Sequence, residues 1–267
     1  MTLLFFLAAL QNQEPVIVEE AKPQRADVEF AAIRQAWLPR FRGSRKVDGD
    51  SLPGTRLRFD DDLNLPNEAT IPMYGGGDIW LSVHQTLWEN WLLLFSAEYW
   101  THEWAGSTTL DSPEAFKGHL FPSGTFVESR FHLMSLMLDA FVVHEEKPFT
   151  VGASIPLQFL SSRFRMDTAG AGDKQTIRDV CWGGGVFARV RPVHWLFAGV
   201  SARGFTSFAH AGETVLGDFK GFGGVQWGPV SLEAGYRWGA AHLWRPDEEL
   251  EYVLYGAYAA LTFTLRF

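Results

Sequence analysis

Apolar and polar residues alternate along most of the chain with a period of two, from about residue 33 onward. In the segment VSLEAGYRWGAA, Leu232, Tyr236 and Trp238 fall on one face, whereas Glu233 and Arg237 fall on the other. Such alternation predicts β-strands with one apolar and one polar face. The alternating segments run for roughly 12 to 18 residues, whereas strands of globular sheets usually have about 5 to 6. Strands of this length suit a barrel wall that crosses a lipid bilayer.

The breaks between these segments are short and long in turn. Outer-membrane barrels of bacteria have short turns at the periplasmic end and longer loops at the outer end. Short breaks are expected at residues 86–90, 145–148, 191–195 and 227–229. Longer ones are expected at residues 48–70, 105–123, 167–176, 209–213 and 245–249. We predict an all-β fold, a closed antiparallel transmembrane β-barrel of about ten strands with both termini at the periplasmic end. Eight or twelve strands are the alternatives, because the segment GTRLRF can form a further short strand.

Aromatic residues gather near both sets of breaks, as amphipathic rings do at the two interfaces of a membrane. One set is near the short turns: Trp88, Trp91, Phe149, Trp195, Trp227 and Phe267. The other set is near the longer loops: Tyr99, Trp104, Trp182, Trp238 and Trp244. We expect these rings to form two belts on the outside of the barrel.

The chain ends in the alternating stretch LTFTLRF, with Leu261, Phe263, Leu265 and Phe267 on one face. In a closed barrel the last strand pairs with the first, so no sheet edge is left in lipid. The stretch YAALTFTLRF resembles the terminal assembly signal of bacterial outer-membrane barrel proteins. The resemblance implies a place in the cell outer membrane, with outer-membrane lipid and the barrel assembly machinery as partners.

The segment GTRLRFDDDLNLP, residues 54–66, is similar to a segment near the start of many uncharacterised outer-membrane barrels. Asn64 stands where glycine is frequent in those proteins. The three consecutive carboxylates at residues 60–62 could bind calcium, since hard cations take carboxylate oxygens. They lack the alternate spacing and the turn glycine of a calcium loop, so we expect a solvated acidic loop.

The first residues differ from the rest of the chain. A short apolar run from Leu3 to Leu10 precedes polar residues, and residues 1–13 are predicted to be a signal peptide. The alternative is an amphipathic or frayed terminus. Residues 14–32 are acidic and contain proline, which predicts a mobile linker. The outer-membrane barrel is predicted to occupy residues 33–267.

Composition narrows the function classes. The net charge of −8 argues against a nucleic-acid partner, which requires a basic face. The single cysteine, Cys181, excludes an intramolecular disulfide and a multi-cysteine metal site. No apolar run reaches the roughly 18 to 20 residues that a membrane-spanning helix needs. Membrane association is therefore expected to come from strands.

Strand parity places charged residues of both signs on the inward face. A barrel of about ten strands has a narrow interior, and unpaired charge in such a space is very costly. We therefore predict a salt-bridged plug rather than an open channel. The predicted luminal charge network consists of Arg40, Arg42, Glu98, His102, Glu128, Arg130, Arg189, Arg203, Lys220, Glu233 and Arg237. The same parity places Asp78, His84, His132, Asp218 and Arg266 inside the barrel.

Four inward residues could also act as metal ligands or as a general acid and base, namely His84, Glu98, His102 and Glu128. Alternation alone puts such residues on one face, so we predict no metal, no cofactor and no catalytic site. The predicted function is that of a small outer-membrane barrel with a structural or passively interacting role. The alternatives are a membrane-embedded lipid-modifying enzyme of the lipid A hydrolase or acyltransferase kind, a narrow channel for small solutes, and a soluble lipocalin-like or sandwich binding protein.

Overall fold

The computed structural model describes residues 27–50, 52–66, 76–88, 90–169, 172–207 and 213–266, which form fourteen β-strands. The strands are β1 (Asp27–Trp37), β2 (Arg40–Val47), β3 (Leu57–Arg58), β4 (Gly76–Trp88), β5 (Trp91–Thr109), β6 (Glu114–Phe116), β7 (His119–Phe121), β8 (Phe126–Glu146), β9 (Phe149–Asp167), β10 (Gly172–Val193), β11 (Leu196–Ser207), β12 (Glu213–Trp227), β13 (Val230–Arg245) and β14 (Glu248–Arg266). None of the described residues belongs to a helix long and apolar enough to cross a membrane. The all-β prediction is confirmed.

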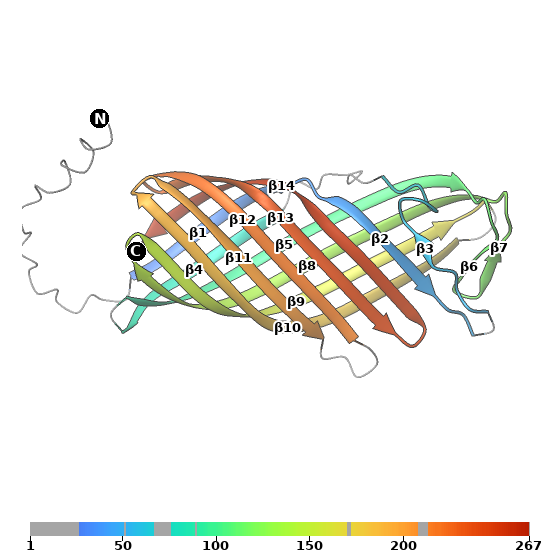
Figure 1. Ribbon diagram of the computed structural model, residues 1–267, viewed down its shortest axis with the longest axis horizontal. Coiled ribbons are helices and arrows are strands. Elements are labelled where there is room, and N and C mark those ends of the chain that lie inside the picture. The colour runs from blue at the N-terminus through green and yellow to red at the C-terminus, as the bar shows by residue number, and fades with distance from the viewer. Residues whose placement is uncertain are drawn as a thin grey trace, which may run out of the picture.

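Twelve of the strands form one antiparallel sheet in the order β1-β4-β5-β8-β9-β10-β11-β12-β13-β14-β2-β3, and β6 and β7 form a separate hairpin. Strand β14 also pairs with β1, in a register that runs from Glu29 opposite Arg266 to Trp37 opposite Tyr258. The order of pairing therefore returns to the strand at which it starts. Figure 1 shows the tilted strands arranged around a common axis.

Strands β1 and β2 lie end to end along β14. The C-terminal part of β14 pairs with β1, and its N-terminal part pairs with β2. The two short strands are separated only by Leu38 and Pro39. Proline has no backbone N–H to donate to a ladder, so Pro39 suits an interruption of a wall strand.

The connections at the end that carries the C-terminus are short, as the sequence predicts. Two residues separate β8 from β9, β10 from β11, and β12 from β13. The sixteen residues between β5 and β8 include the β6–β7 hairpin, at the opposite end in Figure 1. The prediction of a long loop at residues 245–249 is wrong. Arg245 pairs directly with Glu248, and the turn contains only Pro246 and Asp247.

The boundary predicted for the acidic linker is also wrong at its C-terminal side. Strand β1 begins at Asp27 and not at residue 33, because backbone groups of this segment pair with β4 on one side and β14 on the other. The predicted signal peptide and the first part of the linker lie outside the described residues.

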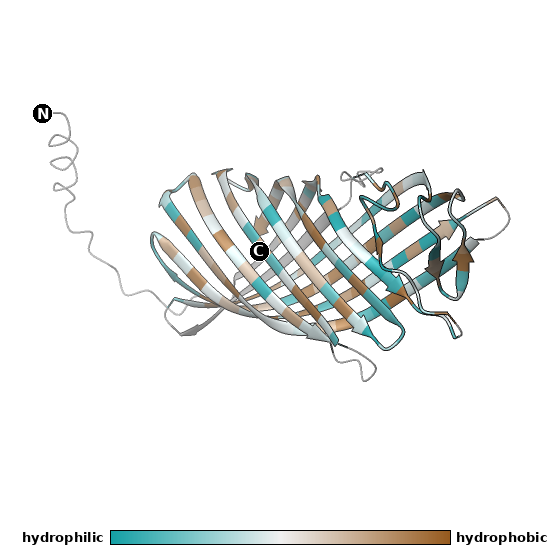
Figure 2. Ribbon diagram, turned by 45° about the vertical axis from the view of Figure 1, so that its right-hand side comes forward, coloured by the Kyte–Doolittle hydropathy of each residue, from teal (hydrophilic) through white to brown (hydrophobic). Residues whose placement is uncertain are grey.

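The outward face of the sheet is apolar from the short turns to about the middle of the strands. Leu232, Tyr236 and Trp238 are about half exposed, as are Leu261, Phe263 and Leu265 of the predicted assembly signal. Figure 2 shows hydrophobic and hydrophilic residues alternating along the strands. Phe267 lies outside the described residues. The outward register of the last two strands therefore agrees with the sequence pattern.

Exposed aromatic residues lie at the short turns and again at about the middle of the strands. Those at the short turns include Trp91, Phe149, Trp195 and Trp227, and those near mid-strand include Tyr99, Trp182 and Trp238, whereas Trp244 lies nearer the other end. The side chain of Trp88 is outside the described part of the structure. Trp104 does not belong to an outer belt, because it points inward and is fully buried.

Candidate functional site

Five charged side chains meet inside the sheet at about the middle of the strands. They are Glu98 on β5, Asp139 on β8, Arg203 on β11, Asp218 on β12 and Arg237 on β13, here named the central ion-pair cluster. Strands β5 and β8 are not neighbours of β11, β12 or β13 in the sheet. The cluster therefore crosses the interior and joins separate parts of the wall.

Two arginines hold three carboxylates in this cluster. The Arg237 Nε–H donates to Asp218 Oδ1 at 2.7 Å, and its Nη1 group donates to Glu98. The Arg203 Nε–H donates to Asp139 Oδ2 at 2.8 Å, and its Nη1 group donates to Asp218 Oδ2 at 3.2 Å. All five side chains are nearly inaccessible to solvent. Such burial is tolerable only when opposite charges and hydrogen bonds compensate for lost hydration.

Four further residues of the predicted charge network also point inward. Lys220 Nζ lies 3.4 Å from Gln35 Oε1 and 4.8 Å from the centre of the Tyr258 ring. The Tyr258 hydroxyl donates to Glu233 Oε1 at 2.7 Å. The Arg189 guanidinium lies 4.0 Å from the centre of the Phe197 ring. His102 is buried between aromatic rings.

The inward assignment of four other residues is wrong. Arg40, Arg42, Glu128 and Arg130 are exposed on the outward face. On β2 and on the outer part of β8 the buried positions carry apolar residues instead, Phe41 on β2 and Phe131 and Leu133 on β8. His132 shares the outward parity of Arg130. The side chains of Asp78, His84 and Arg266 lie outside the described part of the structure.

The interior between the central cluster and the long loops is filled by an apolar core, which the sequence analysis missed. The ring of Phe41 stacks on those of Phe59, Trp104 and Phe131, with ring centres 4.5 to 5.0 Å apart. Phe59 also packs against Phe164 of β9. The described interior is thus ionic near the middle of the strands and aromatic toward the β6–β7 hairpin.

Much of this core comes from the segment between β2 and β4. Leu57, Phe59, Leu63 and Leu65 are almost completely buried, whereas Arg56, Arg58, Asp61 and Asn64 are exposed. Residues 54–66, here named the plug segment, therefore cover the apolar core with one face and reach the surface with the other. The Phe59 N–H donates to the Gly43 carbonyl oxygen at 2.9 Å, and Leu57 and Arg58 pair with β2. The acidic run at residues 60–62 lies at the surface, between the buried residues Phe59 and Leu63 of this segment.

Local contacts fix the turn of the plug segment. The Asp62 carboxylate accepts a hydrogen bond from the Arg58 N–H at 2.7 Å, and Asp61 lies 2.7 Å from the Arg58 guanidinium. Asn64 has a φ of 49°, a left-handed conformation that glycine and asparagine adopt most readily. This conformation accounts for asparagine where similar segments have glycine. The carboxylates of Asp61 and Asp62 thus bind Arg58 and stabilise the turn.

A second buried ion pair lies at the outer end of the core. The Arg45 guanidinium on β2 donates to Glu248 at the start of β14, and both side chains are buried. The Gln175 amide donates to the other carboxylate oxygen of Glu248 at 3.3 Å. These two contacts join β10 and β14 to β2, the strand that precedes the plug segment.

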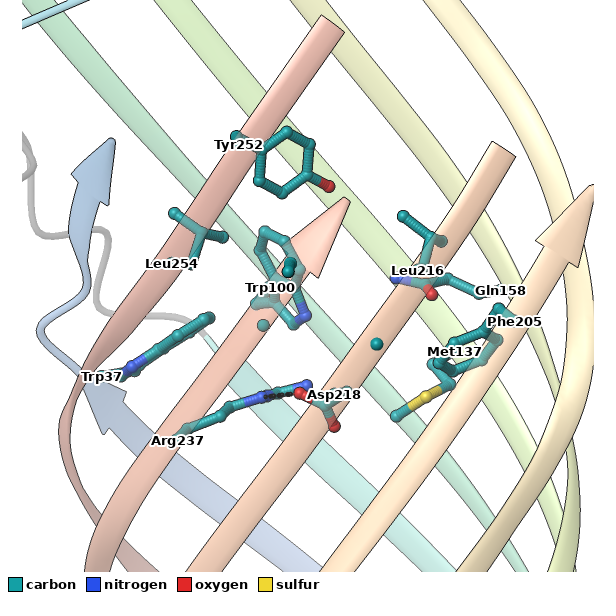
Figure 3. A pocket seen from close by; sticks show the side chains of 13 residues that line it. Trp37, Trp100, Met137, Gln158, Phe205, Leu216, Asp218, Arg237, Tyr252 and Leu254 are labelled. Atoms are coloured by element: carbon teal, nitrogen blue, oxygen red, sulfur yellow. Dashed lines mark hydrogen bonds and ion pairs between the residues drawn. The ribbon is translucent and has the colours of Figure 1, made fainter. Parts of the chain in front are cut away.

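A cavity of about 30 Å³ separates the apolar core from the central cluster. Trp37, Trp100 and Tyr252 line one part of it, and Asp218 and Arg237 line the other (Figure 3). A cavity needs about 10 to 15 Å³ to hold one water molecule. The volume therefore suits one or two waters, and is too small for a substrate of several atoms.

Of the four suggested metal ligands or acid–base residues, the three whose side chains the structure describes are not brought together. Glu98 is engaged by Arg237, Glu128 faces outward, and His102 contacts tryptophan rings. A different group, His242, Glu249 and Glu251, has its ligand atoms within 4.8 Å of one another. These residues lie at the surface, and the Arg56 guanidinium already binds Glu249 at 2.5 Å. That ion pair makes the group a poor cation site.

No protein-family model matches the chain, and no curated protein sequence matches it. Solved structures with a similar fold include the outer membrane protease OmpT from Escherichia coli, with a TM-score of 0.49 and 11% identity over 92% of this chain and 99% of that chain. The transport unit of the autotransporter AIDA-I from Escherichia coli gives 0.40 and 8% over 92% and 93%. The toluene transporter TodX from P. putida gives 0.39 and 9% over 92% and 91%. These proteins differ in function.

Proposed function

We propose that the chain is a closed transmembrane barrel of the bacterial outer membrane. Strands β1 and β2 count as one wall strand, and with β4, β5 and β8 to β14 they make ten. The pairing of β14 with β1 supports closure. Outward apolar residues such as Ile155 and Val186, which are 72% and 62% exposed, support contact with lipid. The exposed rings at the short turns and at mid-strand suit the two interfaces of a membrane.

The barrel is occluded, and its role is structural or passively interacting. The observation that carries this proposal is the filling of the interior at two successive levels. The central ion-pair cluster spans the interior from β5 to β13, and the plug segment with its aromatic core fills the space beyond it. Opposite charges in a narrow, poorly hydrated space attract strongly, so neither level opens without loss of several contacts.

Outer-membrane lipid and the barrel assembly machinery are the proposed partners. We assign no cofactor, no metal and no catalytic residue, because the inward acids and histidine are engaged by arginines or packed between rings. A narrow channel is the second candidate function. It is favoured by the partial exposure of Arg189, Lys220 and Glu233 on the side of the cluster nearer the short turns.

Two measurements test the proposal. The protein extracted from outer membranes is expected to migrate faster on a gel when it is not boiled, because a closed barrel keeps its shape in detergent. In planar bilayers the intact protein is expected to give no stable single-channel conductance. Recovery in the periplasmic supernatant would contradict the barrel, and steady ion-selective openings would favour the channel.

A further inference from the structure

Cationic side chains gather on the outward face of three neighbouring strands. The group consists of Arg130 and His132 on β8, Arg163 and Arg165 on β9, and Lys174 and Arg178 on β10, and is named here the cationic patch. All of these side chains are exposed except His132, which is half-buried. The patch lies toward the strand ends that carry the longer connections.

The strand register sets like charges directly opposite each other. Arg130 on β8 is paired with Arg165 on β9. On the other side of β9, Lys174 is also paired with Arg165. Residues opposite each other on one face have Cβ atoms about 4.5 to 5.5 Å apart, and like charges in such pairs are destabilising. The arrangement therefore favours an anionic ligand that would relieve the repulsion.

The protein itself neutralises little of this charge. Arg165 binds Asp167 at 2.6 Å, and His132 contacts the Thr101 hydroxyl at 3.0 Å. Within the described parts of the chain, no ion pair involves the side chains of Arg130, Arg163 or Arg178. Elsewhere on the outer surface the pattern differs, since Arg56 is held by Glu249 and Glu251. On β8 to β10 three arginines without an ion pair to a described residue, Arg130, Arg163 and Arg178, thus share one face of neighbouring strands.

The patch borders the apolar band of the wall. On β8 the outward residues after His132 are Met134 and then exposed Leu136, and on β9 exposed Phe159 precedes Arg163 by four residues. On β10 Arg178 is followed at the next outward positions by Val180 and Trp182. With a rise of about 3.3 Å per residue along tilted strands, the cations lie roughly 10 Å beyond the apolar surface. This is the level of lipid headgroups.

We propose that the cationic patch binds a phosphorylated lipid headgroup of the leaflet at the loop end of the barrel. Guanidinium groups bind phosphate through two parallel hydrogen bonds, and unpaired Arg130 and Arg163 are the main ligands. The acyl chains of the same lipid lie along Leu136 and Phe159. The cationic patch and the apolar surface follow one another along the same strands. This arrangement favours a lipid over a free anion or an acidic protein. The inference rests on the membrane location proposed above.

Native mass spectrometry of the full chain in detergent tests the site, with phosphatidic acid and phosphatidylcholine as probes. The wild type is expected to bind phosphatidic acid about tenfold more tightly than it binds phosphatidylcholine. This difference corresponds to one additional charge-assisted contact. The variant Arg130→Gln/Arg163→Gln is expected to lose this preference. The matched control Arg40→Gln/Arg42→Gln removes two outward arginines from β2 and is expected to keep it.

Three results overturn the proposal. They are an unchanged preference in Arg130→Gln/Arg163→Gln, an equal loss in the control, and displacement of phosphatidic acid by an equal concentration of inorganic phosphate. Gel mobility before and after boiling is measured for every variant, so failure of the barrel is distinguished from failure of the site. A protein that forms no barrel refutes the proposed function, whereas a folded barrel without lipid preference refutes only the patch.

Discussion

Arg237 on β13 forms an ion pair with Glu98 on β5, across the interior of the sheet. The two strands are separated by several others in the pairing order. Both side chains are almost completely buried, and Arg237 also binds Asp218. The stability of the barrel therefore depends on charges that could not remain buried alone.

Replacing Arg237 by Met is expected to lower the free energy of unfolding by about 3 to 5 kcal/mol, because it leaves two carboxylates buried without this partner. Urea unfolding of the protein in lipid vesicles, followed by tryptophan fluorescence, measures the change. The control Glu146→Gln alters a carboxylate that is 80% exposed at a turn. It is expected to change stability by less than about 0.5 kcal/mol. Equally small effects for both variants would show that the cluster contributes little.

Conduction is expected only when both the plug segment and the central ion-pair cluster are removed. A variant in which a short Gly/Ser linker replaces residues 54–66 still has the central cluster, so it is expected to remain closed in planar bilayers. Combining that replacement with Arg203→Ala, Asp218→Ala and Arg237→Ala is expected to give measurable openings. The cluster variant that retains the plug segment is the control and is expected to be silent. Openings in that control would show that the aromatic core does not seal the barrel.

The register of β13 can be tested by two substitutions three residues apart. Ala234 is exposed on the outward face, whereas Ser231 is half-buried on the inward one. Ala234→Arg places a charge in lipid and is expected to cost about 2 to 4 kcal/mol, whereas Ser231→Asn is expected to be mild. The fraction of folded barrel on unboiled gels is the readout. Similar yields for both variants contradict the proposed register or the membrane location.

Deletion of Phe267, or its replacement by Asp, is expected to reduce the amount of assembled barrel and to increase proteolysis. The terminal ring completes the stretch that resembles an assembly signal, and the residues before it, Phe263 and Leu265, face outward. Pulse-labelled cells, analysed by gel mobility without boiling, provide the measurement. Phe267→Tyr, which keeps an aromatic ring, serves as the control. Normal assembly of the deletion variant would show that this residue is dispensable.

Acidification is expected to loosen the plug segment at its N-terminal end. The Gly54 N–H donates to Asp48 Oδ1 at 2.6 Å, and this bond, with help from Lys46, holds the pKa of Asp48 below its usual range. A lowered folded-state pKa adds stability above the ordinary carboxyl value of about 3.9, and that stability is lost as the pH falls through the folded-state value. The protection factor for amide exchange of residues 54–66, which corrects for the slower intrinsic exchange in acid, is expected to fall. In Asp48→Asn the protection factor is expected to be low already at neutral pH and to respond less to acid.

The sequence predicted the wall well because alternation is a local signal. The parity of β13 and β14, the short turns and the inward position of Glu98, Arg203 and Arg237 all follow from residues close together in the chain. The same reasoning failed for Arg130 and Arg42. Where the strands border an apolar core, the buried face is the more hydrophobic one and the charges face outward.

The apolar core between the central ion-pair cluster and the long loops could not be predicted from the alternation of apolar and polar residues. Phe59 ends the short alternating stretch GTRLRF and Leu63 follows an acidic run, and their burial depends on partners distant in sequence, such as Phe164 for Phe59. The sequence did indicate Asp139 as a candidate inward residue, because it is the single charge within the apolar segment SLMLDAFVV. It shares the parity of Ser135 and Met137, which face inward. Its partner Arg203 could be identified only in three dimensions.

The position of β2 in the sheet has a consequence for the order of assembly. The pairing partners of β2 among the described strands are β14 and β3. The strand that supports the plug segment thus obtains its wall partner from the far end of the chain, and such distant pairings form late. Filling of the interior and docking of the last strand are therefore coupled in time. A chain arrested before that step would expose its aromatic core together with its open edge, which makes the final event the one that chaperones must protect.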